Sequence, residues 1–361
     1  MTDDGLKAAR DRIDRLDEQL QALIGERAGL AQEIARIKAD IDGEAGDCYR
    51  PAREAEVLRA VAARNRGPLS DETVVRLMRE VMSACLALES PLKVAYLGPE
   101  GTYTQAAVYK HFGHSVTAVP LAAIDEIFRE VEAGNADYGV VPVENSTEGV
   151  VSHTLDQLVG SRLSIVGEVA LAVHHHLLSH ASDLSEVKRV VSHAQSLAQC
   201  RKWLDAKLPS VMREAVASNG EAARMVRDEP AAAAIAGRAA SELYELPILC
   251  ANIEDEPNNT TRFLVLGQQS VPATGEDMTS ILVSIHNRPG MLHRLLAPAA
   301  DAGVDLSRIE SRPSRRQAWD YNFFIDLEGH VAEDRVRQVI DRIEAEAAHL
   351  KILGSYPRAV L

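Results

Sequence analysis

A proline-free stretch from Leu6 to Ile41 constrains the fold of this chain more than any other feature. Its apolar residues recur with the spacing of one helix face, and the repeat has heptad character. The apolar seam comprises Ile13, Leu16, Leu20, Leu23, Leu30, Ile34, Ile37 and Ile41. The pattern predicts one long helix. Further helices are predicted from about 51 to 63 and from 71 to 88, and Ser90-Pro91 closes this helical module.

Three basic residues lie along the seam. Arg27 occupies a position where an apolar residue is expected, while Arg10 and Lys38 flank the seam on one shared column. A buried arginine without an anionic partner is very costly. A salt bridge inside a helical bundle would explain any one of these residues, but three aligned cations favour a bound anion.

The distance between Arg10 and Arg27 adds a constraint. On one straight helix they would lie roughly 25 Å apart, which no small ligand spans. If both residues serve one site, they must come from different chains. We therefore predict an intertwined helical dimer.

Composition excludes several classes of function. The chain has 361 residues, enough for two or three domains, and a net charge of -14 without a basic block, so nucleic acid is not an expected partner. Its four cysteines are scattered without CxxC spacing, which favours a reducing cytosol over disulfides or a zinc site. The acidic, polar start does not predict a signal peptide, and no apolar run approaches the length of a membrane span.

The central part of the chain repeats one construction, in which a short buried strand ends in a polar loop. Three strands are predicted at 93–97, 138–143 and 187–191, and they lead into polar stretches at 98–105, 144–149 and 192–196. A fourth polar stretch, Asn258 to Phe263, leads into the apolar run Leu264 to Gly267. An ordinary turn would explain one such stretch. Four of them predict a cleft between two α/β lobes, because ligands bind at the carboxyl ends of strands in open sheets.

Other features of this region point away from cofactors. Its glycines match neither GxGxxG nor a Walker A loop, so neither a dinucleotide nor ATP is expected. The run His174 to His176 resembles a metal motif, but adjacent strand residues point to opposite faces, so we predict a solvated strand end. The Ala-rich run Met225 to Ala240 predicts helix, with breaks at Pro230 and Gly237.

The last part of the chain follows a linker from Ser270 to Asp277 and alternates strands with helices. Strands are predicted at 280–285, 304–310, 318–327 and 351–356, and helices at 289–302 and 332–350. The order βαββαβ predicts a ferredoxin-like α+β domain, a type that often pairs edge to edge.

These three blocks resemble the bacterial bifunctional P-proteins, in which a chorismate mutase domain precedes a prephenate dehydratase domain and a regulatory ACT domain. The resemblance implies a helical domain at 1–90, a two-lobe, periplasmic-binding-protein-like α/β domain at 92–268 and an ACT domain at 278–361. It implies the rearrangement of chorismate to prephenate and the dehydration of prephenate to phenylpyruvate. It also implies inhibition by phenylalanine, a homodimer formed through the first helix and the ACT domains, and no cofactor or metal.

The resemblance also assigns mutase site residues. Arg10, Arg27 and Lys38 match ligands of the substrate carboxylates and ether oxygen, and Arg53-Glu54 match an Arg-Glu pair. Two departures are Arg50, where some members have Asp, and Cys85 with Glu89, where some have Ser and Gln. A cage of cations suffices for a pericyclic rearrangement, which needs neither nucleophile nor cofactor.

In the dehydratase, the resemblance places the essential threonine at Thr261. We expect its hydroxyl to donate a hydrogen bond to the departing oxygen, with Glu144 or His193 as the proton source behind it. Asn145 and Ser146 are expected to hold carboxylates. Further candidates for substrate contacts are Thr102, Gln195, Arg262 and Phe263.

Two stretches of the last domain, Asn287 to Leu292 and Glu310 to Pro313, read on their residues alone as a turn and a strand end. They resemble the stretches that bind phenylalanine in ACT domains. The implied effector residues are Asn287, Gly290, Met291, Leu292, Glu310, Ser311 and Arg312. Met291 replaces an alanine that is common there.

Three alternatives stay open at this point. The chain could be a non-catalytic sensor of amino acids or anions, or a dehydratase whose mutase domain is degenerate. Arogenate could also replace prephenate as the preferred substrate.

We predict that the mutase rate falls as pH rises and Glu89 loses its proton, because only the protonated carboxyl can donate a hydrogen bond to the ether oxygen. In Glu89→Gln the amide donates at every pH, so the profile should flatten. The measurement is the rate of prephenate formation from chorismate against pH. The same profile in the variant as in the wild type would reject this role.

Overall fold

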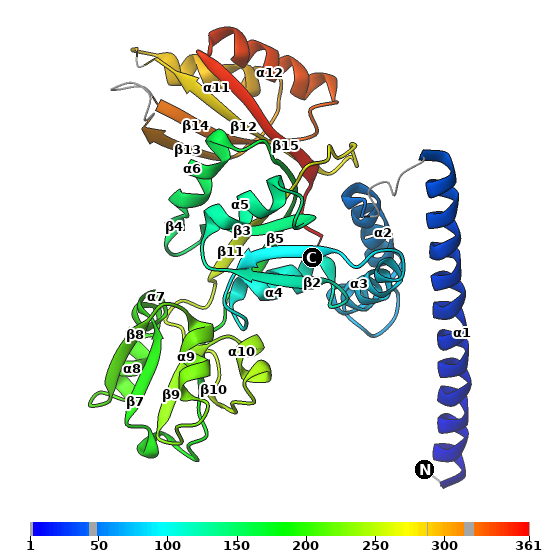
Figure 1. Cartoon of the computed structure of the whole chain (residues 1–361), viewed down its shortest axis with the longest axis vertical. Helices are drawn as coiled ribbons and strands as arrows, with labels where there is room; N and C mark the ends of the chain where they lie inside the picture. Colours follow the sequence, from blue (N-terminus) through cyan, green and yellow to red (C-terminus); the bar gives the residue numbers. More distant parts are fainter. Residues whose placement is uncertain (1–2, 43–48, 287, 314–320, 361) are drawn as a thin grey trace. The chain divides into compact units, whose positions relative to one another are not determined.

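The computed structural model describes residues 3–42, 49–286, 288–313 and 321–360 (Figure 1). The chain divides into two compact units, which are described separately. The first contains Met1–Arg50, Val57–Leu92 and Phe112–Thr117, and the second contains Pro51–Glu56, Lys93–His111 and Ala118–Leu361.

The long helix predicted from the seam is confirmed as α1, Asp3–Asp42, a single helix of 40 residues. Helix α2 spans Pro51–Arg64 and starts with proline at its first turn, where the missing N–H costs no hydrogen bond. Helix α3 spans Asp71–Ala87, and the side chain of Ser70 caps it by accepting a hydrogen bond from the backbone N–H of Thr73.

The apolar seam of α1 faces solvent in the single chain. Leu16, Leu20 and Leu23 are 57%, 56% and 61% exposed. A continuous row of exposed leucines is unusual on the surface of a monomeric protein.

The second unit begins with a mixed sheet whose strand order is β2-β1-β3-β11-β5, with β4 paired to β3. Its strands are β1 Lys93–Leu97, β2 Thr117–Leu121, β3 Tyr138–Asn145, β4 Gly149–Val150, β5 Ser164–Ala172 and β11 Thr260–Gly267. Its helices are α4 Tyr103–Phe112, α5 Ile124–Glu132 and α6 Ser152–Gly160. Strand β1 is parallel to β3, whereas β11 runs antiparallel to both β3 and β5.

Between β5 and β11 the chain builds a second sheet, with the order β10-β6-β9-β7-β8. Its strands are β6 His176–Leu178, β7 Arg189–His193, β8 Met212–Val216, β9 Ala232–Ala236 and β10 Ile248–Cys250. Its helices are α7 Ala194–Gln199, α8 Arg201–Lys207, α9 Asn219–Val226 and α10 Arg238–Leu243. The predicted two-lobe α/β architecture is therefore present, because the chain enters the second lobe after β5 and returns to the first with β11 (Figure 1).

The helix predicted for Met225 to Ala240 is wrong in its middle part, although the two ends of this range belong to α9 and α10. Residues Ala232–Ala236 form β9, the middle strand of the second sheet, and all five are buried. A strand buried on both faces reads as a continuous apolar run, and here the run consists of alanine with one isoleucine. Tertiary burial overrides the helical propensity of alanine, and the two expected breaks, Pro230 and Gly237, flank the strand.

The last sheet has the order β13-β14-β12-β15. Its elements are β12 Asp277–Ile285, α11 Met291–Asp301, β13 Leu306–Pro313, β14 Tyr321–Glu328, α12 Asp334–Glu346 and β15 His349–Pro357, which confirms the predicted βαββαβ fold. One face of the sheet packs on α11 and α12, where Ile281 and Val283 join a core with Leu295 and Val339.

The opposite face of this sheet packs on the first lobe. Leu282 and Phe324 share one buried cluster with Leu155 and Leu158 of α6 and with Ile165 of β5. Strand alternation produces this division, because Leu282 points away from the face that carries Ile281 and Val283. The first lobe and the last domain therefore share a hydrophobic core.

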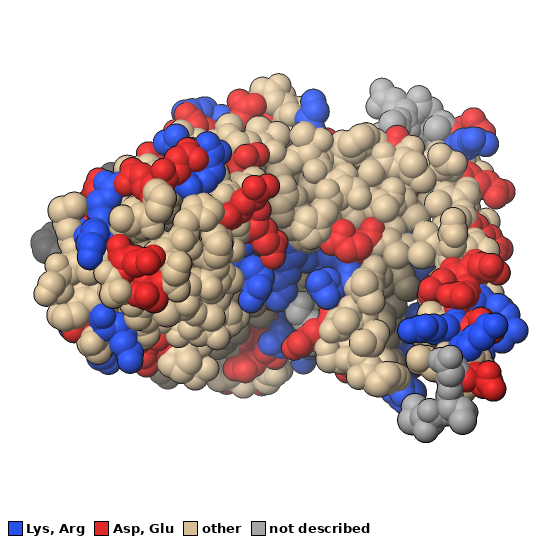
Figure 2. Space-filling model, turned by 90° about the horizontal axis from the view of Figure 1, so that it is seen from below, with Lys and Arg blue, Asp and Glu red and all other residues tan. Residues whose placement is uncertain are grey.

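On the face that Figure 2 draws, acidic and basic side chains are interspersed. No helix among the described residues is long and apolar enough to cross a membrane.

Gly354 marks a close approach of β15 to the first lobe, since an added Cβ would lie 2.1 Å from the carbonyl oxygen of Ile165. We expect Gly354→Ala to lower the free energy of unfolding by about 1–3 kcal/mol, because the two backbones would have to separate. Urea unfolding would measure the change. Gly160→Ala is the control, since its Cβ would meet nothing within 4 Å and stability should stay close to wild type.

Candidate active site

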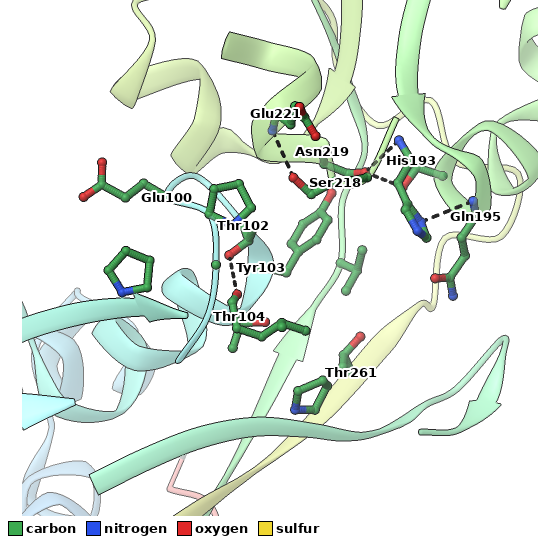
Figure 3. Close-up of a pocket in the computed structure, with 18 of the residues that line it drawn as sticks. Glu100, Thr102, Tyr103, Thr104, His193, Gln195, Ser218, Asn219, Glu221 and Thr261 are labelled. Atoms are coloured by element: carbon green, nitrogen blue, oxygen red, sulfur yellow. Dashed lines mark hydrogen bonds between the residues drawn. The ribbon is translucent and has the colours of Figure 1, made fainter. Parts of the chain in front are cut away.

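A cavity of about 950 Å³ lies in the second unit and is lined by residues of both lobes (Figure 3). The first lobe contributes the segment after β1 and the facing ends of β3 and β11. The second lobe contributes the starts of α7 and α9. Polar lining residues include Thr102, Tyr103, Asn145, His175, His193, Gln195, Gln199, Ser218, Asn219, Asn259 and Thr261.

Two helices of at least two turns begin at this cavity. Helix α4 starts at Tyr103, directly after the lining residue Thr102. Helix α9 starts at Asn219, and the side chain of Ser218 accepts a hydrogen bond from the backbone N–H of Glu221. Helix N-termini offer unpaired backbone N–H groups and the positive end of the helix dipole. The two helix N-termini therefore offer an anion a place to bind, in a cavity whose lining also contains Arg224 and the carboxylates of Glu100 and Glu221.

Thr261 and Asn145 are cross-strand partners on β11 and β3. The Nδ2 of Asn145 donates a 2.8 Å hydrogen bond to Oγ1 of Thr261, and its Oδ1 accepts from the backbone N–H groups of Thr147 and Glu148. These contacts fix the orientation of the amide. Because the threonine oxygen accepts from Asn145, its one hydroxyl proton remains available for donation into the cavity.

The hydrogen bonds continue from Asn145 into the second lobe and back. Asn145 donates to Oδ1 of Asn259 at 2.7 Å, and Asn259 donates to Oε1 of Gln199 at 3.2 Å. His175 Nε2 lies 2.8 Å from the same Gln199 oxygen, and its Nδ1 lies 2.8 Å from the hydroxyl of Tyr103. This chain of polar groups connects α4 of the first lobe with α7 of the second through the segment between the lobes.

His175 is 1% exposed, and burial lowers the pKa of its imidazole, a shift that the Gln199 hydrogen bond opposes. The neutral ring has one N–H. The Gln199 oxygen can only accept, so Nε2 carries the proton and Nδ1 is an acceptor. The Tyr103 hydroxyl has one proton and lies 2.8 Å from both Nδ1 and the carbonyl oxygen of His174.

The prediction of a solvated strand end at His174 to His176 is wrong for two of the three residues. His175 and His176 are both buried, and His176 Nδ1 accepts a hydrogen bond from the backbone N–H of Asn252. His174 bonds to Glu254 at 2.9 Å. The run lies at the end of the segment that joins the lobes, where His174 is exposed and the next two histidines are buried. Within the described ranges, no group of His, Cys, Asp and Glu is placed to hold a metal ion.

Five of the predicted dehydratase residues line the cavity together: Thr102, Asn145, His193, Gln195 and Thr261. His193 ends β7 and caps α7, and its Nδ1 accepts from the backbone N–H of Gln195. The stretch around it is thus a strand end and a helix start, not the loop that the sequence pattern predicted. Ser146 lies beside the cavity, where its hydroxyl donates to the carbonyl of Asn258 and accepts from the backbone N–H of Thr260.

Glu144, Arg262 and Phe263 do not line the cavity. Thr261 to Phe263 belong to strand β11 itself, not to a loop before it, so neighbouring side chains point to opposite faces. Phe263 is 1% exposed within the core. Arg262 pairs with carboxylates of β5 and β14, and Glu144 pairs with Arg308. We leave these three residues out of the proposed substrate contacts.

The mutase candidates lie on several elements. Arg10 and Arg27 are on α1, and Arg27 is half-buried while Arg10 is exposed. The side chain of Lys38, also on α1, lies outside the described residues. Arg50 is exposed at the start of α2, within which Arg53 forms an exposed ion pair with Glu56.

Glu54 is partly buried in α2, and Cys85 is 4% exposed in α3. Glu89 lies in the turn after the end of α3, where its N–H donates to the carbonyl of Leu86, so it does not share a helix with Cys85 as predicted.

The regulatory candidates flank α11 and β13. Asn287 lies outside the described residues. Gly290 has a φ of 82° and precedes Met291, where α11 begins, and Leu292 is 44% exposed. Glu310 and Ser311 lie on β13, and Arg312 on the same strand bonds to Ser152 and Asp156 of α6.

The cavity also contains residues that sequence reasoning missed, namely Tyr103, His175 and Gln199. The histidine run could have pointed to His175, but we interpreted the run as a solvated strand end and so did not predict that His175 is buried.

Comparison with known proteins identifies each part of the chain. Family models match residues 9–90 as chorismate mutase type II, 94–271 as prephenate dehydratase and 279–345 as ACT domain. The chain is 58% identical over 361 residues to the bifunctional chorismate mutase/prephenate dehydratase of Pseudomonas aeruginosa, with 99% of each covered. It is 49% identical over 355 residues to the protein of the same name from Neisseria gonorrhoeae, with 98% of this chain and 97% of the relative covered.

Two solved structures resemble the second and third blocks. A prephenate dehydratase from Arthrobacter aurescens in complex with L-Phe is 33% identical, with a TM-score of 0.69 over 74% of this chain and 90% of that chain. A protein described as a novel type of quorum quenching acylase, GqqA, is 29% identical, with a TM-score of 0.68 over 74% of this chain and 98% of that chain.

We predict that the protein loses stability as pH falls below about 6.5, the ordinary histidine value. Burial lowers the pKa of His175 and His176. The unfolded chain therefore binds these protons more tightly, and protonation favours unfolding. The free energy of unfolding should fall by up to about 1.4 kcal/mol per pH unit for each residue, until pH reaches the lowered value.

Urea unfolding from pH 7 downward measures this slope. His175→Gln should reduce it, while His180→Gln, at an exposed position, serves as the control. Equal slopes in the His175 variant and the wild type would contradict the assignment.

Proposed function

The chain belongs to the family of bifunctional chorismate mutase/prephenate dehydratases, and we propose on this basis where each of its two reactions takes place. The protein rearranges chorismate to prephenate and converts prephenate to phenylpyruvate. The first reaction needs a cationic cage. The second needs help for a departing hydroxide, so the two sites should look different.

We assign the dehydratase reaction to the cavity lined by Thr261. The observation that carries this assignment is the hydrogen bond from Asn145, which leaves the threonine proton free to be given away. The substrate carboxylates would lie against the N-termini of α4 and α9, where backbone N–H groups can hold them. Thr261 would then donate to the ring hydroxyl as it leaves.

The electron flow in this step is balanced without a cofactor. The bond from the ring to its carboxylate breaks, carbon dioxide departs, and the electron pair completes the aromatic ring. The ring C–O bond breaks with its electron pair on oxygen, and the hydroxide takes one proton to become water. His193 is the better candidate for that proton, because it lines the cavity whereas Glu144 is paired with Arg308.

The mutase site is proposed to form between two copies of the chain. The exposed seam of α1 needs a covering surface, and a second α1 has the same apolar repeat. In that dimer Arg10 of one chain could reach the same substrate as Arg27 of the other. Lys38, Arg53 and Glu54 would complete the cage, with Arg50, Cys85 and Glu89 as further candidates.

Phenylalanine is the proposed inhibitor, bound by the ACT domain. Support comes from the ACT family model and from the similar dehydratase that was solved with L-Phe. Gly290 to Leu292 and Glu310 to Arg312, together with Asn287, are the proposed contacts, and paired ACT domains would extend the dimer. The free cysteines Cys85, Cys200 and Cys250 fit the cytosolic location that we propose.

The alternatives are less well supported. A non-catalytic sensor would not need the Thr261 hydroxyl, and close relatives carry both enzyme names over their full length. Amide hydrolysis, which the likeness to GqqA raises, requires a base beside its nucleophile. Among the residues that the structure describes, the hydrogen-bond partner of Thr261 Oγ1 is the amide of Asn145, which donates and cannot take a proton from it.

We expect Thr261→Ala to lower kcat for phenylpyruvate formation from prephenate by about 10²–10³-fold, since one hydrogen-bond donor to developing charge is lost. Thr261→Ser should keep most of the rate because it keeps the hydroxyl. Product absorbance measures both, with and without phenylalanine, and wild type should be inhibited. Full activity in Thr261→Ala would move the chemistry to another part of the cavity.

A further inference from the structure

The strands that carry Thr261 and Asn145 also carry two charged residues on their other face. Glu144 precedes Asn145 on β3, and Arg262 follows Thr261 on β11. Arg262 and Glu144 are cross-strand partners, as Thr261 and Asn145 are. One pair therefore faces the cavity while the adjacent pair faces away from it.

The ACT sheet presents the complementary pair. Arg308 on β13 and Asp326 on β14 are cross-strand partners as well. Arg262 Nη1 lies 2.5 Å from Asp326, and Arg308 Nε lies 3.2 Å from Glu144. We call Glu144, Arg262, Arg308 and Asp326 the charge square. Each charge faces an opposite charge on the other sheet and lies beside an opposite charge in its own sheet. Sliding one sheet along the other by one strand would therefore bring like charges together, so the pattern fits only one alignment of the two sheets.

The two ion pairs of the charge square differ in how many further hydrogen bonds their groups make. Arg262 also bonds to Glu168 at 2.8 Å and to the hydroxyl of Tyr356 at 3.0 Å, and Asp326 accepts from Ser280 at 2.6 Å. These groups are well satisfied. Arg308 has a side chain only 10% exposed, yet its Nε and Nη2 make no hydrogen bond with the residues that the structure describes. The Glu144–Arg308 pair can therefore move while breaking fewer hydrogen bonds than the Arg262–Asp326 pair.

The backbone beside the square is irregular. The pairing of β11 with β3 shifts register between Arg262 and Phe263, immediately after the charged pair. Bulges of this kind turn side chains relative to a regular ladder and are found next to active sites. A small movement of Glu144 would therefore be transmitted to Asn145 and to the threonine hydroxyl that Asn145 orients.

We propose that Glu144 and Arg308 are positioning residues, which hold Asn145 and Thr261 in their reactive arrangement through the charge square. The position of the ACT sheet against the first lobe then helps to set the rate of dehydration, although no residue of that sheet touches substrate. This inference rests on the proposed role of Thr261. A misplacement of about 1 Å can cost up to about 10²-fold in rate, so a loosened square should be visible in kcat.

The test is a double-mutant cycle in the full-length protein with Glu144→Gln, Arg308→Gln and the combined variant. Each single variant should lower kcat for prephenate by about tenfold and leave KM within about twofold, since the proposed substrate contacts remain. The combined variant should be no slower than the slower single variant, because both changes break one link. Arg342→Gln is the matched control, since its ion pair with Asp301 lies within the ACT domain, and it should match wild type.

A second cycle separates positioning from general damage. In a Thr261→Ala background, Glu144→Gln should cause little further loss, because the residue acts through that hydroxyl. Thermal unfolding confirms that each variant is folded. The proposal is overturned by wild-type kcat in both single variants, by multiplying losses in the combined variant, by a loss confined to KM, or by an undiminished loss in the Thr261→Ala background. Failure of the Thr261 assignment would show separately, as full activity of Thr261→Ala.

Discussion

A threonine hydroxyl that accepts a hydrogen bond still has one proton to give, and the role that we propose for the cleft depends on that property. Asn145 holds the oxygen from one side, and the backbone N–H groups of Thr147 and Glu148 hold Asn145. From there the amides of Asn259 and Gln199 lead to a neutral, buried imidazole at His175. The two backbone N–H groups fix which end of the Asn145 amide faces Thr261, so the threonine oxygen accepts there and its proton is left for another partner.

The two proposed sites hold similar dianionic molecules by different means. The helical module offers arginine side chains, which supply full charges and stabilise an ether oxygen that becomes negative. The dehydratase cleft offers helix N-termini and small polar groups. A strong cation beside the departing carboxylate would favour the charged form over neutral carbon dioxide, so a weaker hold suits a decarboxylation. One overall charge of -14 accommodates both, because local groups decide binding.

Periodic patterns allowed much of this architecture to be predicted. The seam of α1 and the βαββαβ order of the ACT domain are repeats that depend on local residues alone. Strand β9 was missed, because burial between neighbouring strands, and not local propensity, sets the conformation of its alanines. The cavity positions of Thr261, Asn145 and His193 followed from the resemblance. The outward direction of Glu144 and Arg262 did not, since it depends on where β3 and β11 start their alternation and on partners more than 60 residues away in the chain.

The core shared by Leu282, Phe324, Leu155 and Leu158 has a further consequence for how such a chain can be cut or recombined. Three blocks are visible in the sequence, which suggests modules that could be exchanged at their linkers. A chain that ended near Ser270 would, however, expose the apolar surface of the first lobe to solvent. A foreign domain placed there would have to match both the shape of that apolar surface and its pattern of charges. The ACT domain thus completes the hydrophobic core of the dehydratase domain, and the two domains would be inherited together.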